Sequence, residues 1–128
     1  MRALVPKSIS APLARYSHGV EVLGPARLIF CSGQLGIAAD GTVPENAEEQ
    51  ARLCFRAVAA ILAEGGLTLG DLVRLNAYVT SPAHLSAYMK ARDEFVSDPP
   101  PASTLMIVSG FSRPEFKVEV EAIAARAL

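Results

Sequence analysis

Apolar and polar side chains alternate at every second position in the stretch LVRLNAYVT, residues 72–80. Its apolar set is Val73, Leu75, Ala77 and Val79, and its second set is Arg74, Asn76, Tyr78 and Thr80. This period of two predicts a strand with one buried face. Further strands are predicted over residues 19–22, 27–32, 102–108 and 117–124. The first two of these flank a turn that contains Gly24 and Pro25, so a hairpin is expected there.

Apolar residues recur at helical spacing in two other stretches. The first helix is predicted to begin near residues 44–46, and Gly65 and Gly66 are expected to end it. The second is predicted to begin with Ser81 as its cap and Pro82 as its first helical residue, and to end before the prolines at 99–101. Each has one apolar stripe for the core, formed by Ala51, Cys54, Phe55, Val58, Ile61 and Leu62 in the first and by Leu85, Tyr88, Met89 and Phe95 or Val96 in the second.

The predicted order of elements is β-β-α-β-α-β-β within a single domain, residues 1–128. Each helix joins two strands through a connection of more than about a dozen residues, which suits right-handed crossovers and places both helices on one face of one sheet. The expected fold class is therefore α+β. The other face carries apolar residues such as Leu105 and Ile107 without a cover from the same chain, which predicts an oligomer.

Composition and charge exclude several functions. The chain has 12 Lys and Arg against 13 Asp and Glu, a net charge of -1, so it offers no basic surface for nucleic acid or an anionic membrane. No uninterrupted run of about 18 apolar residues predicts a membrane span, and no signal peptide is recognised, so a cytoplasmic location is expected. Cys31 and Cys54 are expected to be reduced core thiols. His18 and His84 lack the spacing of metal ligands, so no metal site is predicted.

Five segments in this order, RYSHGVEV, IFCSGQLGI, NAYVT, PPPAST and KVEVEAIAA, resemble the RidA (YjgF) superfamily of enamine and imine deaminases over nearly the whole chain. The resemblance implies a chorismate-mutase-like α+β fold with one mixed sheet, and a homotrimer with three ligand clefts between its subunits. It also implies a hydrolase that releases ammonia from small reactive enamines or imines without a cofactor. Some members of the family have been labelled ribonucleases, but the net charge of -1 argues against nucleic acid as a partner.

The resemblance also implies roles for individual residues. Tyr16, the Ser32-Gly33-Gln34 turn and the strand residue Glu121 match the polar lining and the water-orienting glutamate of the family. The arginine that grips the substrate carboxylate does not carry over, because Ser103 occupies its position in PPPAST. A serine offers one neutral hydrogen bond in place of two charge-assisted bonds, which would lower carboxylate affinity on the order of a hundredfold.

Several alternatives remain open for the residues of this site. Arg15, next to Tyr16, is a candidate replacement for the missing arginine, or else a solvated surface residue, and His18 is either an acid or base or a polar residue at the start of a strand. If the last two strands form a hairpin that pairs Ser103 with Glu121, these side chains share a face with about 5 Å between their Cβ atoms. The Ser103 and Thr104 hydroxyls are then expected to face the cleft. Glu121 is either the water-orienting base or a packing residue at a subunit boundary.

Two functions follow from these observations. The first is a RidA-like hydrolase whose choice of substrate is altered because Ser103 replaces the arginine. The second is a non-catalytic trimer that binds or senses a small molecule after losing the chemistry. Both require a small-molecule cleft between copies of the chain.

Overall fold

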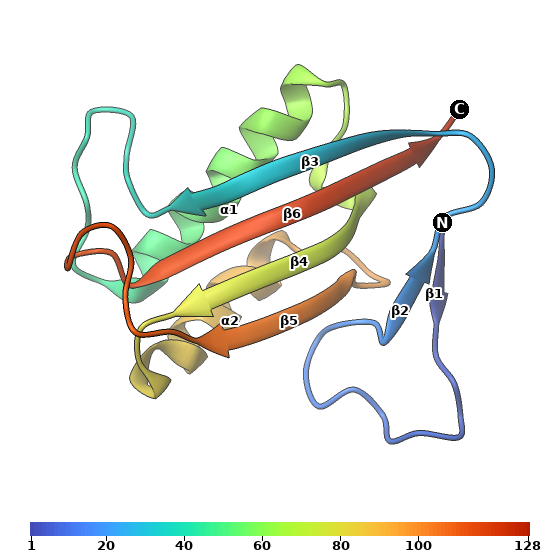
Figure 1. Cartoon of the computed structure of the whole chain (residues 1–128), viewed down its shortest axis with the longest axis horizontal. Helices are drawn as coiled ribbons and strands as arrows, with labels where there is room; N and C mark the ends of the chain where they lie inside the picture. Colours follow the sequence, from blue (N-terminus) through green and yellow to red (C-terminus); the bar gives the residue numbers. More distant parts are fainter.

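The computed structural model describes all of residues 1–128, and it consists of a four-stranded sheet with two helices against one face (Figure 1). The sheet is formed by β3 (Ala26–Leu35), β4 (Leu72–Val79), β5 (Ala102–Ile107) and β6 (Val118–Ala127), in the order β3-β6-β4-β5. β4 and β5 are parallel and the other neighbours are antiparallel, so the sheet is mixed. The predicted α+β class, with both helices on one face, is confirmed.

The helices are α1 (Ala47–Glu64) and α2 (Leu85–Phe95), and the 3-10 turns η1 (Leu69–Asp71) and η2 (Pro82–His84) precede β4 and α2. α1 begins where the Asn46 side chain accepts a hydrogen bond from the Glu49 backbone N–H, and the chain leaves it through Gly66, whose φ of 77° favours glycine. Ser81 accepts from the Ala83 N–H as a cap, but it begins the 3-10 turn η2, and α2 begins only at Leu85, later than predicted. The helix positions therefore follow from local signals in the sequence.

The core lies between the helices and the inner face of the sheet. The predicted stripe of α1 is buried there, with Ile61 only partly covered, and α1 packs against α2 through stacking of Phe55 on Tyr88 and Phe95. From the sheet, β6 contributes Val118, Val120, Ala122 and Ala124, each at most 3% exposed. Cys31 and Cys54 are both free and buried in this core, as predicted.

The predicted hairpin between residues 19–22 and 27–32 is wrong. β2 (Gly19–Glu21) instead pairs with β1 (Arg2–Leu4) in a separate two-stranded sheet. The cause lies just before β2, where the Ser17 N–H donates to the Pro101 carbonyl at 2.9 Å and fixes this segment beside the start of β5. Since β5 and β3 form opposite edges of the large sheet, the chain must cross the molecule between β2 and β3.

The predicted pairing of the last two strands is also wrong. β6 does not return beside β5; it lies between β3 and β4, and β5 takes the edge next to β4. The side chains of the two strands explain this order, because the inner row of β6 is entirely apolar whereas that of β5 includes the hydroxyl of Ser103 and leaves Ile107 50% exposed. A strand with a completely apolar inner row is best buried at the centre of the sheet.

A single buried amide on α1 holds two loops at one end of the sheet. The Nε2 of Gln50 donates to the carbonyls of Pro44 and Glu115 at 2.7 and 2.9 Å, and its Oε1 accepts from the Lys117 N–H at 2.8 Å. At Gly36 the chain approaches so closely that a Cβ would lie 2.4 Å from that of Gln50. Gln50 thus ties the segments after β3 and before β6 to the helix layer.

Replacing Gln50 with leucine should lower the free energy of unfolding by about 2–4 kcal/mol, because two carbonyls and one N–H lose their partner. Urea unfolding measures the change. Tyr88→Phe is the control, since the Tyr88 hydroxyl is buried but has no hydrogen-bond partner. Its removal should change the unfolding free energy by no more than about 0.5 kcal/mol. Equal losses in the two variants would contradict the role of Gln50.

Candidate active site on the open face of the sheet

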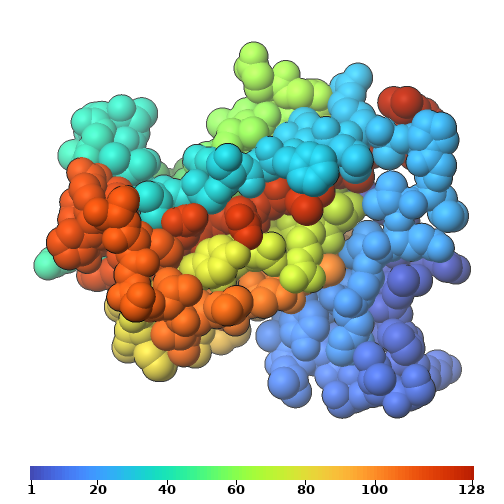
Figure 2. All heavy atoms as spheres, in the orientation of Figure 1, coloured from blue at the N-terminus to red at the C-terminus, as the bar shows by residue number.

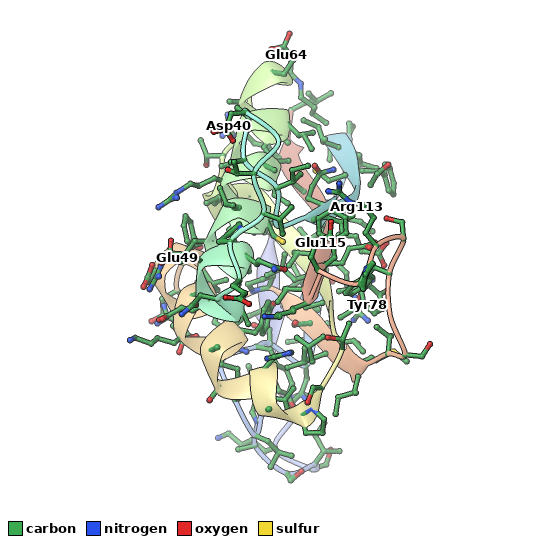
Figure 3. All side chains as sticks on the ribbon, turned by 90° about the vertical axis from the view of Figure 1, so that its left-hand side faces the viewer. Asp40, Glu49, Glu64, Tyr78, Arg113 and Glu115 are labelled. Atoms are coloured by element: carbon green, nitrogen blue, oxygen red, sulfur yellow. The ribbon has the colours of Figure 1, made fainter.

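Polar side chains gather on the face of the sheet that the helices do not cover. Figure 2 shows this open face, with β3, β6, β4 and β5 side by side. Glu121 of β6 lies opposite Asn76 of β4, which lies opposite Thr104 of β5, and Tyr78 and Glu119 form the next pair along. The edge-on view in Figure 3 has Tyr78 on the side away from the helices. The prediction that Asn76 and Tyr78 share a face is confirmed, and Glu119 and Glu121 lie on the same face of the sheet.

A hollow of about 330 Å³ opens on this face. Three strands line it, with Phe30, Cys31 and Ser32 from β3, Arg74 and Asn76 from β4, and Glu121, Ala122 and Ile123 from β6. Its walls combine apolar groups with one cation, one amide, one hydroxyl and one carboxyl. A volume of this size is at the low end for small-molecule sites.

Glu121 is held by two neighbours on β4. The Tyr78 hydroxyl donates to Oε1 of Glu121 at 2.6 Å, and Nδ2 of Asn76 donates to the same oxygen at 3.1 Å. No protein group hydrogen-bonds Oε2 of Glu121. The carboxyl group is therefore fixed in direction while one oxygen keeps its capacity to accept a proton or a hydrogen bond.

Two other groups in this cluster have shifted pKa values. The hydrogen bond to Glu121 raises the pKa of the Tyr78 hydroxyl, because ionised tyrosine could no longer donate it. Partial burial raises the pKa of Glu119, and the charge of Glu121 raises it further. Placing two carboxyl groups on one face of β6 thus disfavours the charged form of Glu119.

A β-bulge brings Ser32 and Gly33 opposite Glu121. In the β3–β6 ladder Cys31 pairs with Ala122 and Gln34 with Val120, so two residues of β3 face one residue of β6. The expected Ser32-Gly33-Gln34 turn is therefore not a turn but an irregular part of a strand that continues to Leu35. Bulges of this kind redirect side chains and are frequent beside active sites.

Gly33 leaves room in this bulge for the side chain of Glu119. A Cβ at Gly33 would lie 1.9 Å from Oε1 of Glu119, so a larger residue would displace the glutamate side chain. The close approach of Gly33 leaves room for Glu119 to lie against β3. This contact helps to keep Glu119 partly buried.

Ser103 does not share a face with Glu121, contrary to the prediction. Ser103 pairs with Leu75, which pairs with Ala122, so its side chain belongs to the row on the helix side. The reason is that β4 and β6 pair with each other, with β5 outside them. Thr104 is the hydroxyl on the open face, and it accepts a hydrogen bond from Nη2 of Arg74 at 2.6 Å.

The predicted residues near the N-terminus lie by the edge of the sheet rather than in the hollow. Tyr16 and His18 flank Ser17, which is bound to the start of β5, and their rings meet edge to face with 5.8 Å between centroids. Nη2 of Arg15 donates to the Val96 carbonyl at 3.0 Å, after the end of α2. The structure thus unites Ser32, Gly33 and Glu121, and separates them from Arg15 and Tyr16 within one chain.

Arg74 is the residue of the hollow that the sequence reasoning did not single out. The alternation of β4 already assigned it to the same face as Asn76 and Tyr78, and that was the available signal. The sequence indicated Arg15 instead as a replacement for the missing arginine, because Arg15 adjoins Tyr16. In the whole chain no three His, Cys, Asp or Glu side chains come close enough together to share a metal ion.

Known proteins resemble this chain in sequence and in fold. The family model described as Endoribonuclease L-PSP matches residues 7–126. Protein mmf2, mitochondrial, of Schizosaccharomyces pombe is 35% identical over 112 residues, which are 86% of each chain. The 2-iminobutanoate/2-iminopropanoate deaminase of Escherichia coli is 26% identical over 98% of each chain. A crystal structure of the Rid-family protein YyfB from Yersinia pestis superposes with a TM-score of 0.86 at 27% identity, covering 98% of both chains.

The name of the Schizosaccharomyces relative refers to mitochondria, so the cytoplasmic location expected from the sequence stays a prediction. None of the helices has the length and apolar character needed to span a bilayer. One family model matches almost the entire chain, and the fold and the similarity to named deaminases agree with it. Together these findings show the family. The chain belongs to the RidA/YjgF superfamily of reactive-intermediate deaminases and their relatives.

Proposed function

We propose that the protein hydrolyses a small reactive enamine or imine in the hollow of the open face, with Glu121 as the base that orients and deprotonates water. The observation that carries this proposal is the state of the Glu121 carboxyl group. Two donors fix Oε1, and Oε2 has no protein partner in a hollow of about 330 Å³. A base must lie within hydrogen-bond reach of the water that it activates, and Oε2 is free to accept a hydrogen bond from a water in the hollow.

The chemistry requires only water and a proton carrier. Oε2 of Glu121 takes one proton from the water as its oxygen bonds to the imine carbon. The electron pair of the C=N bond moves to nitrogen, which takes this proton back from Glu121. The hydroxyl group of the carbinolamine then gives its proton to Glu121, which passes it to the amino group. The C=O bond forms, the C–N bond breaks and ammonia leaves. An enamine first takes up a proton on carbon to give the imine. No resident cofactor is needed for these steps.

The apolar residues of the open face support a homotrimer in which other copies cover this face. Leu28 and Phe30 on β3 are 52% and 70% exposed, and Met106 on β5, at the opposite edge of the sheet, is 52% exposed. Burial of such side chains favours association. In a trimer, Tyr16 and Arg15 of a neighbouring copy could approach the hollow that they do not reach within one chain.

Because Ser103 replaces the arginine of other members, the residue that selects the substrate is expected to differ from theirs. If catalysis has been lost, the alternative is a trimer that binds a small molecule without turning it over. Nucleic acid is a poor candidate for either function, since Glu119 and Glu121 give the open face acidic groups.

Replacing Glu121 with glutamine should reduce ammonia release from freshly generated 2-iminopropanoate or 2-iminobutanoate by about 100- to 10,000-fold, the usual contribution of a general base. Glutamine preserves the size of the side chain but cannot accept the proton. Glu115→Gln, in the loop before β6, is the control and should keep full activity. Ammonia release that survives in Glu121→Gln would refute the role of Glu121, and none from the unaltered protein would favour the binding-only alternative.

The Glu119→Gln variant should be more stable than the unaltered protein at neutral pH. Because the pKa of Glu119 is raised in the folded state, its contribution to stability is complete only below the unfolded pKa of about 4.3 and is lost as pH rises through the folded pKa. Glutamine does not pay this penalty at any pH. Thermal unfolding between pH 4 and 8 should give a difference that grows with pH, whereas a constant difference would contradict the raised pKa.

Sedimentation velocity should give a particle of three times the 13.5 kDa chain mass. Leu28→Glu should shift the protein toward the monomer, because it introduces a charge into the apolar part of the open face. Leu23→Glu makes the same change at an exposed leucine in the turn before β3 and should leave the trimer intact. A monomer before any substitution would rule out the proposed assembly.

A further inference from the structure

Arg74 has an unusual environment among the arginines of this chain. Only Arg52, Arg74 and Arg92 are substantially shielded from solvent. Arg52 pairs with Glu48 and Glu94, and Arg92 pairs with Asp93. Arg74 forms no ion pair with any carboxylate of the chain. A partly shielded guanidinium without a counter-charge loses hydration that no ion pair replaces, so this position favours an anion from outside the chain.

The contacts of Arg74 hold the guanidinium in place without neutralising it. Its Nε donates to Oδ1 of Asn76 at 2.9 Å, and its Nη2 donates to the Thr104 hydroxyl at 2.6 Å. Both partners are neutral, and the guanidinium has further N–H groups to offer. The cation is therefore pre-oriented on the wall of the hollow, which reduces the entropy lost when it binds a ligand.

Asn76 keeps this cation apart from the carboxyl group of Glu121. Its Oδ1 accepts from Arg74 while its Nδ2 donates to Oε1 of Glu121 at 3.1 Å, so the amide occupies the space between them. In the ladder Glu121 is opposite Asn76 and diagonal to Arg74, a relation that separates side-chain bases by roughly 7–8 Å. Without this spacer the two charges could pair and close the site.

We propose that Arg74 is the residue that binds the carboxylate of the substrate and so restricts the site to small 2-imino or 2-oxo acids. The reaction at Glu121 rests on the proposed function. The binding of an acid by Arg74 does not depend on it. A carboxylate held by Arg74 lies in the same hollow as the carboxyl group of Glu121, which is on the neighbouring strand and one residue pair further along the ladder. Phe30 and Ile123, in the same row as Arg74, provide an apolar wall for a short side chain. The cation thus comes from β4, not from the position of Ser103.

Binding of pyruvate and of its neutral analogue pyruvamide tests this inference on the full chain, by isothermal titration calorimetry at low salt. The unaltered protein should bind pyruvate at least about tenfold more tightly than pyruvamide, because only the acid forms charge-assisted bonds. Arg74→Gln should weaken pyruvate binding by about 10- to 100-fold and leave pyruvamide unchanged. Arg74→Lys, which keeps the charge but loses the planar fork, should fall between the two.

Arg56→Gln is the matched control, since it removes one positive charge from an exposed position on α1, in the helix layer behind the sheet. It should bind pyruvate as the unaltered protein does. No binding of pyruvate, equal binding of acid and amide, or an equal loss in Arg56→Gln would overturn the proposal. If an Arg74 variant fails to fold, the comparison of pyruvate with pyruvamide in the unaltered protein still tests whether the site prefers an acid.

Kinetics separate this inference from the proposed function. Where ammonia release is measurable, Arg74→Gln should raise KM with a smaller effect on kcat, whereas Glu121→Gln should lower kcat. Ammonia release with an unchanged KM in Arg74→Gln would refute the role of Arg74 and leave the deaminase intact. Pyruvate binding that depends on Arg74, in a protein that releases no ammonia, would support Arg74 and refute the deaminase.

Discussion

Pairing of β6 along both of its edges is the constraint on which the fold and the candidate site depend. Its inner row of Val and Ala residues completes the core beneath α1 and α2, and its outer row directs Glu119 and Glu121 toward the open face. Because β4 and β3 flank it, Glu121 has Asn76 on one side and the Ser32–Gly33 bulge on the other. A strand at the edge of the sheet could not have gathered groups from two neighbours in this way.

The sequence patterns correctly predicted the helices and most of the strands, but not which strands pair with each other. Helix limits followed from caps, glycines and apolar stripes, all of which act within a few residues. Strand pairing depends on contacts between distant segments, which alternation does not encode. The hydrogen bond from Ser17 to Pro101 holds the start of β2 beside β5, so β2 does not pair with β3. The apolar inner row of β6 favours a central place in the sheet, and a hairpin with β5 would not provide it.

The same distinction applies to the site. Alternation correctly assigned Arg74, Asn76 and Tyr78 to one face of β4. The same period of two puts Glu119 and Glu121 on one face of β6. It could not reveal that these two faces adjoin, because that follows from strand order. Ser103 was misassigned for the same reason, and the bulge at Ser32 and Gly33 has no signature in a periodicity of two. Glu121 was identified only through the family resemblance.

The hydrogen bonds between Arg74, Asn76 and Glu121 all run in one direction. Each N–H along this path is oriented from the guanidinium toward the carboxyl group, and the amide of Asn76 cannot reverse without losing both partners. Aligned donors of this kind polarise one another in a medium of low dielectric constant. The hollow therefore has a fixed polarity, from the guanidinium of Arg74 on β4 to the carboxyl group of Glu121 on β6, which would favour one orientation of a dipolar guest.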